Sequence, residues 1–425
     1  MGDGTPLTFG KEMAEAVVRR KPARVGLRLK IDLWLFLAVF TLLVIGLLMV
    51  YSASTDYSFV VLDEDPTYMF RRQLLFLGIG ILAATILAWL DYHIWRKLAI
   101  PMIMGTIILL FLVLVVNEVI NNAARTIFQG SGQPSEIAKL AIILYLSVWL
   151  YAKRDQLSQV SFGLLPLSIL LGILGGLIFL QPDLSATATI FILGGIMFFL
   201  AGGDLRQIAA FLFIGTIVGW MVFRFHPTGS SRLASYMVSI NDLTQAPMHL
   251  SRSLEALVKG GWLGVGIGRA DTKLTGLPVP PTDSIFAVVG EELGVLGATV
   301  LVGLFALILW RGLKIAQQAP DGLGQLMASG LSIWLALEAF INMAVIVGLV
   351  PFAGNALPFI SYGGSNLLVS LAAIGILMSI SRHSAREREK ERKVFDAVID
   401  LRRRDWRRRV SSPSGPGSTT KRTGR

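Results

Sequence analysis

Apolar runs close to the thickness of a lipid bilayer recur along this chain, and they restrict its fold more than any other feature. A membrane-spanning helix needs about 20 mostly apolar residues, so the shorter runs require tilting or local thinning of the bilayer. Ten runs qualify: Ile31–Tyr51, Gln73–Leu90, Leu98–Val116, Pro134–Tyr151, Leu164–Leu180, Leu184–Ala201, Gln207–Phe223, Ser284–Trp310, Leu326–Val350 and Asn366–Ile380. The sequence therefore predicts an all-α polytopic membrane protein with ten transmembrane helices.

The placement of positive charge predicts the orientation of these helices. Most of the 39 Lys and Arg residues lie before the first run, after the last run, or in the loops after runs two, four, six and eight. Cytoplasmic segments carry such an excess, so we expect both termini in the cytosol. The chain is 53% hydrophobic and 16% charged, which is too apolar for an ordinary soluble domain.

The net charge of +11 raises the question of a nucleic-acid partner. Basic clusters at 382–393 and 402–409 directly follow the last run, where they meet the anionic inner leaflet, so we expect contact with the lipid bilayer and no nucleic acid. Apolar residues at roughly helical spacing within 385–409 indicate a helix lying on that leaflet, and the Ser/Pro/Gly-rich end from 411 is typical of disorder. A docking site for cytosolic factors is the alternative.

Three regions follow from these patterns. Residues 1–30 form a basic cytosolic N-terminal arm, 31–382 a ten-helix membrane domain, and 383–425 a basic, partly disordered cytosolic tail. The membrane domain includes a long outer loop between spans seven and eight, residues 224–283. Loops of this length in compact proteins are usually functional or disordered. Its glycine run, 260–268, lacks the strand–helix context of a dinucleotide site, and we expect a close approach of two backbones there.

Glu136 and Lys139 are charged residues near the start of the fourth span. They share one helix face at a spacing of three residues and can therefore pair. A lone charge at bilayer depth costs roughly 2.5–3.5 kcal/mol, so such residues normally face a partner or a cavity. The pair is either a packing device or part of a polar cavity that opens outward, and we favour the cavity.

Asp283 ends the long outer loop just before the eighth span. The prolines at 278, 280 and 281 stiffen the approach and fix where its carboxylate points. A simple helix cap is the alternative role for Asp283. Glu291 and Glu292 lie further along the eighth span. We expect one of the two to face the cavity and assign this position to Glu291.

The outer loops are unusually cationic for a face that the positive-inside rule leaves neutral. Their cations are Arg125, Arg232, Arg252, Lys259, Arg269 and Lys273. Together they suit an anionic ligand such as a phosphate or pyrophosphate, with a solvated loop surface as the alternative for each one. Asp183 and Ser365 lie in helix-breaking turns that we expect to line the same outer side. The four histidines show no spacing typical of a metal site.

Four motifs follow one another along the chain: Gln-Pro-Ser-Glu-x-x-Lys at 133–139, Gln-Pro-Asp-Leu at 181–184, Thr-Asp-x-Ile-Phe-Ala-Val-x-Gly-Glu-Glu-Leu-Gly at 282–294, and Leu-Pro-Phe-Ile-Ser-Tyr-Gly-Gly-Ser at 357–365. In this order they resemble the SEDS family (shape, elongation, division and sporulation; the RodA/FtsW group). The resemblance covers about 31–382. It departs from the family at Val279 and Pro281, where Glu and His are usual, and at Ala124-Arg125-Thr126, where Arg-Arg-Trp is usual.

The resemblance implies a peptidoglycan glycosyltransferase of the bacterial cytoplasmic membrane. Such proteins polymerise lipid II, an undecaprenyl-pyrophosphoryl-linked muropeptide, and work with a class B penicillin-binding protein that is a transpeptidase. The family's essential aspartate matches Asp283, and its span-four pair matches Glu136 and Lys139. The partner's membrane helix is expected against spans eight and nine, at Gly290, Gly294, Gly297, Ala298 and Gly303. Packing within the bundle is the alternative role for some of these glycines.

This chemistry needs a general base for the acceptor hydroxyl and positive charge for the departing pyrophosphate. We expect Asp283 to be that base in an inverting displacement, with the divalent cation Mg²⁺ as an optional cofactor and no other. Arg125, Asp183, Lys273, Glu291 and Ser365 are expected to bind substrate or line the cavity with Glu136 and Lys139. A transporter of lipid-linked sugars and a non-catalytic scaffold of cell-wall synthases are the alternative functions.

Overall fold

The computed structural model describes residues 32–119, 133–225, 227–242 and 245–410. In these residues the chain forms helices and no strands, so the all-α prediction is confirmed there. The helices are α2 (Leu33–Val60), α3 (Tyr68–Trp89), η1 (Tyr92–Ile94), α4 (Trp95–Val119), α5 (Pro134–Ala152), η2 (Arg154–Gln156), α6 (Leu164–Leu180), α7 (Leu184–Leu200), α8 (Leu205–Phe225), α9 (Pro227–Asn241), α10 (Met248–Gly260), α11 (Ile285–Gln317), α12 (Gly322–Ile346) and α13 (Gly364–Val410).

Each predicted apolar run corresponds to one helix. Among the described residues, seven helices are long and apolar enough to cross a membrane: α2, α3, α4, α5, α11, α12 and the first part of α13. The runs at α6, α7 and α8 form shorter apolar helices. The positions of the elements therefore agree with the sequence pattern, and the crossing of the bilayer by all ten helices stays a prediction.

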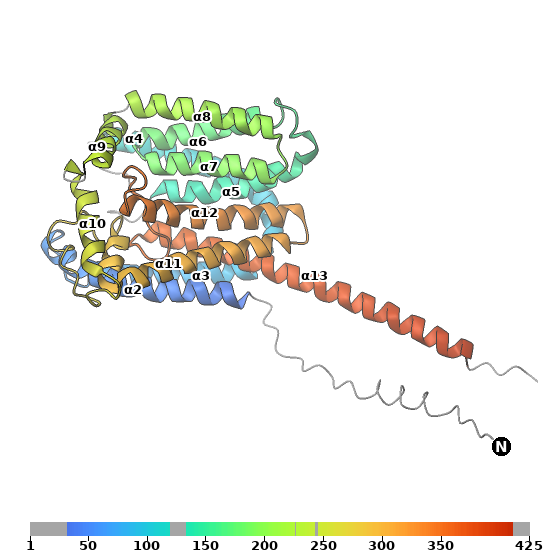
Figure 1. The fold of residues 1–425 in the computed structure, drawn as a ribbon. Helices are drawn as coiled ribbons and strands as arrows, with labels where there is room; N and C mark the ends of the chain where they lie inside the picture. The colour runs from blue at the N-terminus through green and yellow to red at the C-terminus, as the bar shows by residue number, and fades with distance from the viewer. Residues whose placement is uncertain (1–31, 120–132, 226, 243–244, 411–425) are drawn as a thin grey trace, which may run out of the picture.

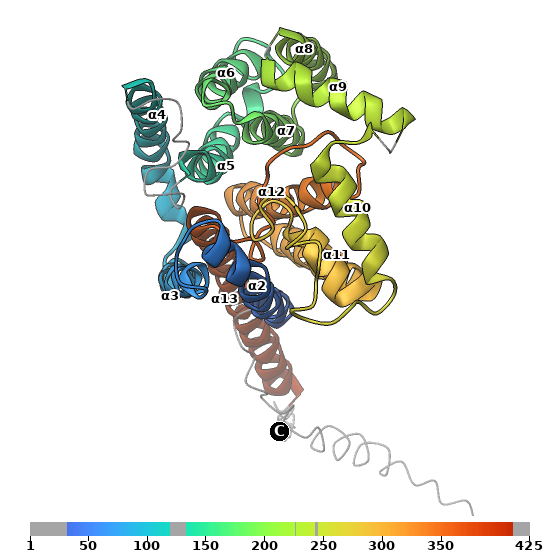
Figure 2. The same cartoon turned by 90° about the vertical axis from the view of Figure 1, so that its left-hand side faces the viewer.

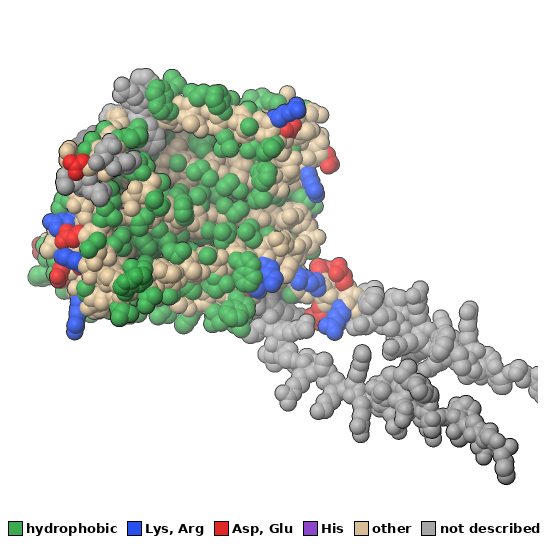
Figure 3. All heavy atoms as spheres, in the orientation of Figure 1, with side chains coloured by type: hydrophobic (Ala, Val, Ile, Leu, Met, Phe, Trp, Pro, Cys, Tyr) green, Lys and Arg blue, Asp and Glu red, His purple; other side chains and the backbone are tan. Residues whose placement is uncertain are grey.

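The long helices lie side by side in one bundle, and α9 and α10 cross over one of its ends (Figures 1 and 2). Helix α2 begins, and α13 leaves the bundle, at the opposite end. A broad apolar band covers the side of the bundle, and charged side chains gather at the two ends (Figure 3). Trp34, Leu82 and Trp89 are among its exposed residues. Apolar surface of this extent is unfavourable in water and suits a lipid environment.

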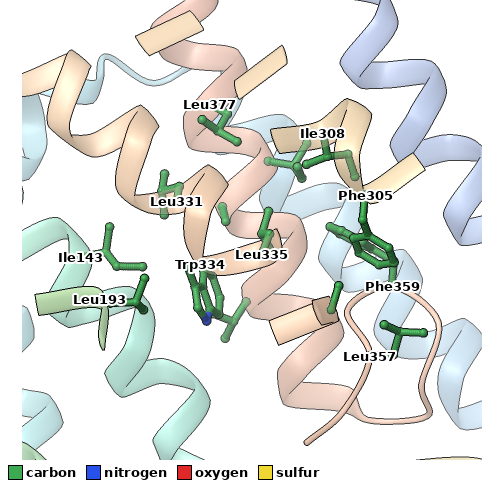
Figure 4. Close-up of a cluster of buried hydrophobic side chains, with 14 of the residues drawn as sticks. Ile143, Leu193, Phe305, Ile308, Leu331, Trp334, Leu335, Leu357, Phe359 and Leu377 are labelled. Atoms are coloured by element: carbon green, nitrogen blue, oxygen red, sulfur yellow. The ribbon is translucent and has the colours of Figure 1, made fainter. Parts of the chain in front are cut away.

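The interior of the bundle is centred on α5, α12 and the membrane part of α13, which are mostly buried, whereas α3 is mostly exposed. Trp334 of α12 is fully buried there, beside Ile143 of α5 and Leu193 of α7 (Figure 4). A densely packed core of this kind holds side chains in fixed positions. It therefore fixes the outer ends of the helices that surround it.

Helix α11 is broken at Gly294, whose φ of 67° and ψ of −170° are not helical. The backbone of the glycine run fills the break. The N–H of Val265 donates to the carbonyl of Glu291 at 2.9 Å, and the N–H of Val295 donates to the carbonyl of Gly261 at 2.9 Å. Peptide groups freed by a helix break must find partners inside a membrane protein, and here the outer loop supplies them. The expected close approach of two backbones is confirmed.

Gly264 provides a test of this junction. Its φ is +80°, and an added Cβ would lie 2.2 Å from the carbonyl oxygen of Glu292. Gly264→Ala is therefore expected to destabilise the protein by about 1–3 kcal/mol, or more if the backbones separate. The control is Gly303→Ala in α11, the helix against which this part of the loop packs, because an added Cβ there meets nothing within 4 Å. Equal thermal denaturation midpoints of the two variants in detergent would contradict the junction's role.

Helix α13 continues without interruption past the boundary predicted at residue 382. The helical conformation predicted over 385–409 is confirmed, because α13 extends to Val410, and its position on the inner leaflet stays a prediction. Arg388, beyond that boundary, still donates a hydrogen bond to the carbonyl of Gln318 (3.3 Å), so the bundle and the tail share one element. The whole N-terminal arm, residues 1–30, and the end of the tail from residue 411 lie outside the described residues.

Candidate functional site

A polar cavity of about 180 Å³ lies at the end of the bundle that α9 and α10 cross (Figure 1), where α5, α7, α11 and α13 all begin. Its lining residues are Gln133, Glu136, Lys139, Asp183, Ser185, Ala186, Thr282, Asp283, Gly354, Asn355, Ala356, Tyr362, Gly363, Ser365 and Asn366. Of the predicted site residues, the structure brings Glu136, Lys139, Asp183, Asp283 and Ser365 together here. Segments distant in the sequence therefore meet around one hollow.

Asp183 holds the starts of α5 and α7 together. Its Oδ1 accepts a hydrogen bond from the N–H of Ala186 at 3.1 Å, which caps α7. Its Oδ2 accepts from Gln133 Nε2 and from Ser135 Oγ, both at 2.9 Å. Its carboxylate is thus fully used in positioning two helices. Ser365 has a comparable role at α13, where its Oγ accepts the N–H of Gln133 at 3.1 Å.

The floor of the cavity contains a buried network of three charges. Lys139 Nζ lies 2.8 Å from Glu136 Oε1 and also donates to Glu338 Oε1 of α12. Asn366 Nδ2 completes the network by donating to Glu136 Oε2 at 3.2 Å. Lys139 is 1% exposed and Glu338 is 0% exposed. Each of these charges needs the others, because an unpaired ion at this depth is strongly unfavourable.

Glu338 is a residue that the sequence analysis missed. It lies inside the ninth apolar run, where a carboxylate is as costly as the lysine that drew attention to Lys139. The same rule applied to span nine would have identified it. Its pairing with a residue 199 positions away is a tertiary contact that spacing along the chain does not reveal.

Asp283 lies in a segment whose backbone is fixed from two sides. Its carbonyl accepts a hydrogen bond from Asn342 Nδ2 at 3.0 Å, and the carbonyl of Thr282 accepts from Ser361 Oγ at 2.7 Å. The carboxylate itself lies against Gly354, since a Cβ built on that glycine would be 3.0 Å from Asp283 Oδ2. Asp283 therefore combines a rigid backbone with a side chain at the cavity wall.

Lys273 and Glu291 lie away from this cavity, contrary to the expectation from sequence. Glu291 accepts from the N–H of Asp271 at 3.0 Å and from the side chain of Thr272. Lys273 Nζ lies 3.3 Å from Glu292 Oε1 and donates to the carbonyl of Ser52 at 3.0 Å. These buried contacts fasten the outer loop to α2 and α11. Arg125 lies outside the described residues.

Other loop cations expected around Asp283 also make their contacts away from the cavity. Arg252 and Lys259 both pair with Glu255 along α10, at 2.6 and 3.1 Å, and their hydrogen bonds lower the pKa of that exposed carboxylate. Arg232 packs over the ring of Phe352. Among the residues described, Lys139 is the cation that lines the cavity.

The helix starts provide the remaining positive potential. A helix N-terminus carries a partial positive charge and unpaired N–H groups, which favour anions. Helices α5 and α11 have no side-chain hydrogen bond at their N-cap residues, Gln133 and Ser284. The cavity thus joins the ammonium of Lys139 with helix dipoles, next to the carboxylate of Asp283.

Metal binding was a further expectation. The lining carboxylates of Glu136 and Asp183 are engaged by Lys139 and by the α5 and α7 starts, as described above. Over the described ranges, no group of three or more His, Cys, Asp or Glu is arranged to hold an ion. Asp283 and the neutral amides and hydroxyls around it also line the cavity.

Comparison with known proteins identifies the family. The family model for cell cycle proteins of the FtsW/RodA/SpoVE group, which is the SEDS family, matches residues 33–386. The chain belongs to this family. The match begins at the first residue of α2 and ends in α13, so it includes every segment that lines the cavity. The resemblance seen in the four motifs is confirmed.

Individual SEDS relatives match over most of their length. A probable peptidoglycan glycosyltransferase FtsW of Trichlorobacter lovleyi is 38% identical over 373 residues, covering 86% of this chain and 96% of that protein. Stage V sporulation protein E of Bacillus subtilis is 38% identical over 368 residues, covering 83% and 97%.

Solved structures share the fold. One chain of a peptidoglycan synthase complex, described as coordinating polymerization and crosslinking, has a TM-score of 0.67 at 28% identity and covers 84% of this chain and 99% of that one. The rod shape determining protein RodA of Thermus thermophilus has a TM-score of 0.61 at 27% identity and covers 84% and 98%. The SEDS architecture thus applies to the whole described bundle.

Proposed function

We propose that this SEDS protein is a peptidoglycan glycosyltransferase that polymerises lipid II into glycan strands. Relatives that are 36–38% identical to it over the aligned residues carry the name probable peptidoglycan glycosyltransferase. The observation that carries the proposal is the junction of Asp283, Lys139 and the helix starts around one outer cavity. That combination supplies a base and an anion-binding environment in the same place.

The reaction is a direct displacement at the anomeric carbon of the donor sugar. Asp283 takes the proton of the acceptor hydroxyl as its oxygen attacks, and the bond from that carbon to the pyrophosphate oxygen breaks on the opposite face. The configuration is therefore inverted. Undecaprenyl pyrophosphate leaves as an anion, so no second carboxylic acid is needed to protonate it, unlike in glycoside hydrolysis. A Mg²⁺ ion, when bound, would neutralise the pyrophosphate.

The dipoles of α5 and α11 stabilise the negative charge that develops on the leaving group, and Lys139, whose charge Glu136 and Glu338 offset, contributes its remaining N–H donor. Preorganised charges of this kind act strongly where water is excluded. The cavity, at about 180 Å³, is smaller than the roughly 300–1,000 Å³ of pockets that enclose drug-sized ligands. A lipid-linked disaccharide therefore needs more room than this cavity provides, and we infer that the cavity widens when the substrate binds.

A lipid-linked sugar transporter is the competing function. The region inward of the Lys139 network is filled by Trp334, Leu335 and Ile143, which are fully buried (Figure 4). This packed core supports a site that works from one face rather than a path across the bilayer. The test supplies lipid II to the purified protein with its co-purified partner. Glycan strands from wild type support polymerisation, whereas movement of lipid II across vesicles without strand formation would overturn it.

We further propose that the protein works beside a class B penicillin-binding protein that crosslinks the strands. One solved relative belongs to a complex described as coordinating polymerization and crosslinking. Both termini lie in the cytosol in this proposal, which puts the cavity on the outer face of the bacterial cytoplasmic membrane. This placement agrees with the distribution of Lys and Arg along the chain.

Among the glycines of α11 predicted to meet the partner, Gly303 is the one with open space around its Cβ position. Gly290 and Gly294 are occupied by the outer loop, since an added Cβ at either would meet loop atoms at 2.3–2.4 Å. At Gly297 an added Cβ would lie 2.2 Å from Leu293 Cβ, whereas Gly303 has nothing within 4 Å. Gly303 thus remains available for close contact with a second helix.

Gly303→Leu is therefore expected to reduce co-purification of the transpeptidase severalfold without changing membrane insertion. The change adds bulk where a partner helix would approach and leaves the bundle interior untouched. Gly105→Leu is the matched control, because an added Cβ on α4 also meets nothing within 4 Å. Equal recovery of the partner with both variants would place the interface elsewhere.

A further inference from the structure

The N-terminus of α11, next to Asp283, is held by a hydroxyl in an unusual way. Ser284 occupies the N-cap position, where serine normally accepts a hydrogen bond from a backbone N–H in the first turn. It makes no such bond. Its Oγ instead donates to the carbonyl of Pro278 at 2.6 Å, and Nε2 of His249 lies 3.0 Å from the same oxygen. Ser284 is 0% exposed, so these contacts matter for a hydroxyl with no access to water.

The direction of these bonds follows from proton counting. A serine hydroxyl has one proton, and here it goes to the carbonyl of Pro278. Ser284 Oγ can therefore only accept from His249, which requires the proton of the imidazole on Nε2. Burial lowers the pKa of His249 to about 4, so the ring is neutral at neutral pH. It packs against Phe352 at a centroid distance of 4.2 Å, which restricts its rotation.

Three further anchors fix the proline-rich segment 278–284. The carbonyl of Pro281 accepts the N–H of Tyr362 at 2.8 Å. The carbonyls of Thr282 and Asp283 accept from Ser361 and Asn342, as described for the site. These three anchors come from α12 and from the turn before α13. The Ser284–His249 contact adds an anchor from α10 of the outer loop, on the other side of the segment.

We propose that His249 is a positioning residue for Asp283, acting through Ser284. The imidazole fixes the Ser284 hydroxyl, the hydroxyl fixes the turn from Pro278 into α11, and the turn aims the preceding carboxylate at the acceptor. His249 lies outside the catalytic cavity, in a neighbouring cavity of about 160 Å³ that Arg232, Tyr236 and Phe352 also line. His249 therefore does not line the cavity in which the reaction is proposed. The inference rests on the proposed function and names a further residue for that same site.

The size of the expected effect follows from geometry. A misplacement of about 1 Å of a catalytic group can cost about 100-fold in rate. Loss of the His249–Ser284 bond releases one anchor of several, so we expect a loss of about tenfold in kcat. KM is expected to stay within about twofold, because the cavity wall that contacts substrate is unchanged.

The test is a double-mutant cycle on polymerisation by the purified protein with its co-purified partner. The variants are His249→Leu, Ser284→Ala and the double variant, with His249→Gln as the conservative control. A glutamine amide can supply an N–H at the place of Nε2, whereas leucine fills similar space without a donor. If the two residues act through one bond, the double variant loses no more kcat than His249→Leu, and His249→Gln retains most of the wild-type kcat.

The possible results distinguish failure of the role inferred for His249 from failure of the proposed function. Losses that multiply in the double variant, or an unchanged kcat in both single variants of an active wild type, overturn the inference alone. The size-exclusion profile shows whether His249→Leu folds. If it does not fold, the kcat of Ser284→Ala is compared with that of His249→Gln, and equal losses of kcat in these two variants overturn the inference. Wild-type protein that forms no glycan overturns the proposed function and this inference with it.

Discussion

Asp283→Asn is expected to lower the rate of lipid II polymerisation by about 10²–10⁴-fold while the protein stays folded. The amide has nearly the same shape as the carboxylate but does not accept the acceptor's proton. The hydrogen bonds that hold this segment use the backbone carbonyl of Asp283, which the substitution leaves intact. The rate of lipid II consumption and the thermal denaturation midpoint are to be measured on the same preparation.

Asp183→Asn is the matched control, because Asp183 lines the same cavity and carries the same charge. An asparagine oxygen can still accept from Ala186 and cap α7. Its amide nitrogen cannot accept from Gln133 and Ser135, so we expect a loss of stability of about 1–3 kcal/mol and a rate within about tenfold of wild type. A similar loss in both variants would assign the effect to the charge of the cavity rather than to a base. Near-normal synthesis by Asp283→Asn would remove its proposed role.

The parts of the site found from sequence share one property: each is recognisable from its immediate neighbours. Lys139 is conspicuous because it interrupts an apolar run, and Asp283 because three prolines precede it at a predicted helix start. Such signals depend on the free-energy cost of a charge in an apolar run or on the restriction that proline places on the backbone, and both can be recognised from neighbouring residues in the sequence. The ten apolar runs were located for the same reason.

The contacts that the sequence did not reveal are long-range. Lys273 was expected at the cavity because of its loop and charge, yet its partner Glu292 lies on α11 and its other acceptor, Ser52, on α2. Only the packed bundle decides which of several carboxylates a lysine meets. The pairing of Arg252 and Lys259 with Glu255 was readable in advance, since spacings of three and four residues on one helix bring these charges together.

The positive potential of the cavity therefore has a different source from the one expected from the sequence. The expected ring of loop cations is replaced by one buried ammonium and the starts of several helices. Backbone dipoles need no charged side chain and so leave no trace in composition. This makes Lys139 the residue on which the anion-binding capacity of the described cavity most depends.

Lys139→Met is expected to destabilise the protein by about 3–5 kcal/mol and to abolish polymerisation. Removing one partner of a buried pair leaves uncompensated charge, and here both Glu136 and Glu338 would face each other without a cation. Glu338→Gln is the milder counterpart, since the Lys139–Glu136 pair at 2.8 Å remains. Denaturation midpoints in detergent and lipid II turnover give the two readouts.

A triple variant, Glu136→Gln/Lys139→Met/Glu338→Gln, separates stability from chemistry. It removes all three charges, and well-packed neutral replacements of buried ion pairs are often as stable as the original. Its denaturation midpoint is therefore expected to return close to that of wild type. Polymerisation is expected to stay lost, because the leaving pyrophosphate would meet a cavity without the ammonium. Recovery of polymerisation together with stability would show that the network serves only the packing of α5 against α12.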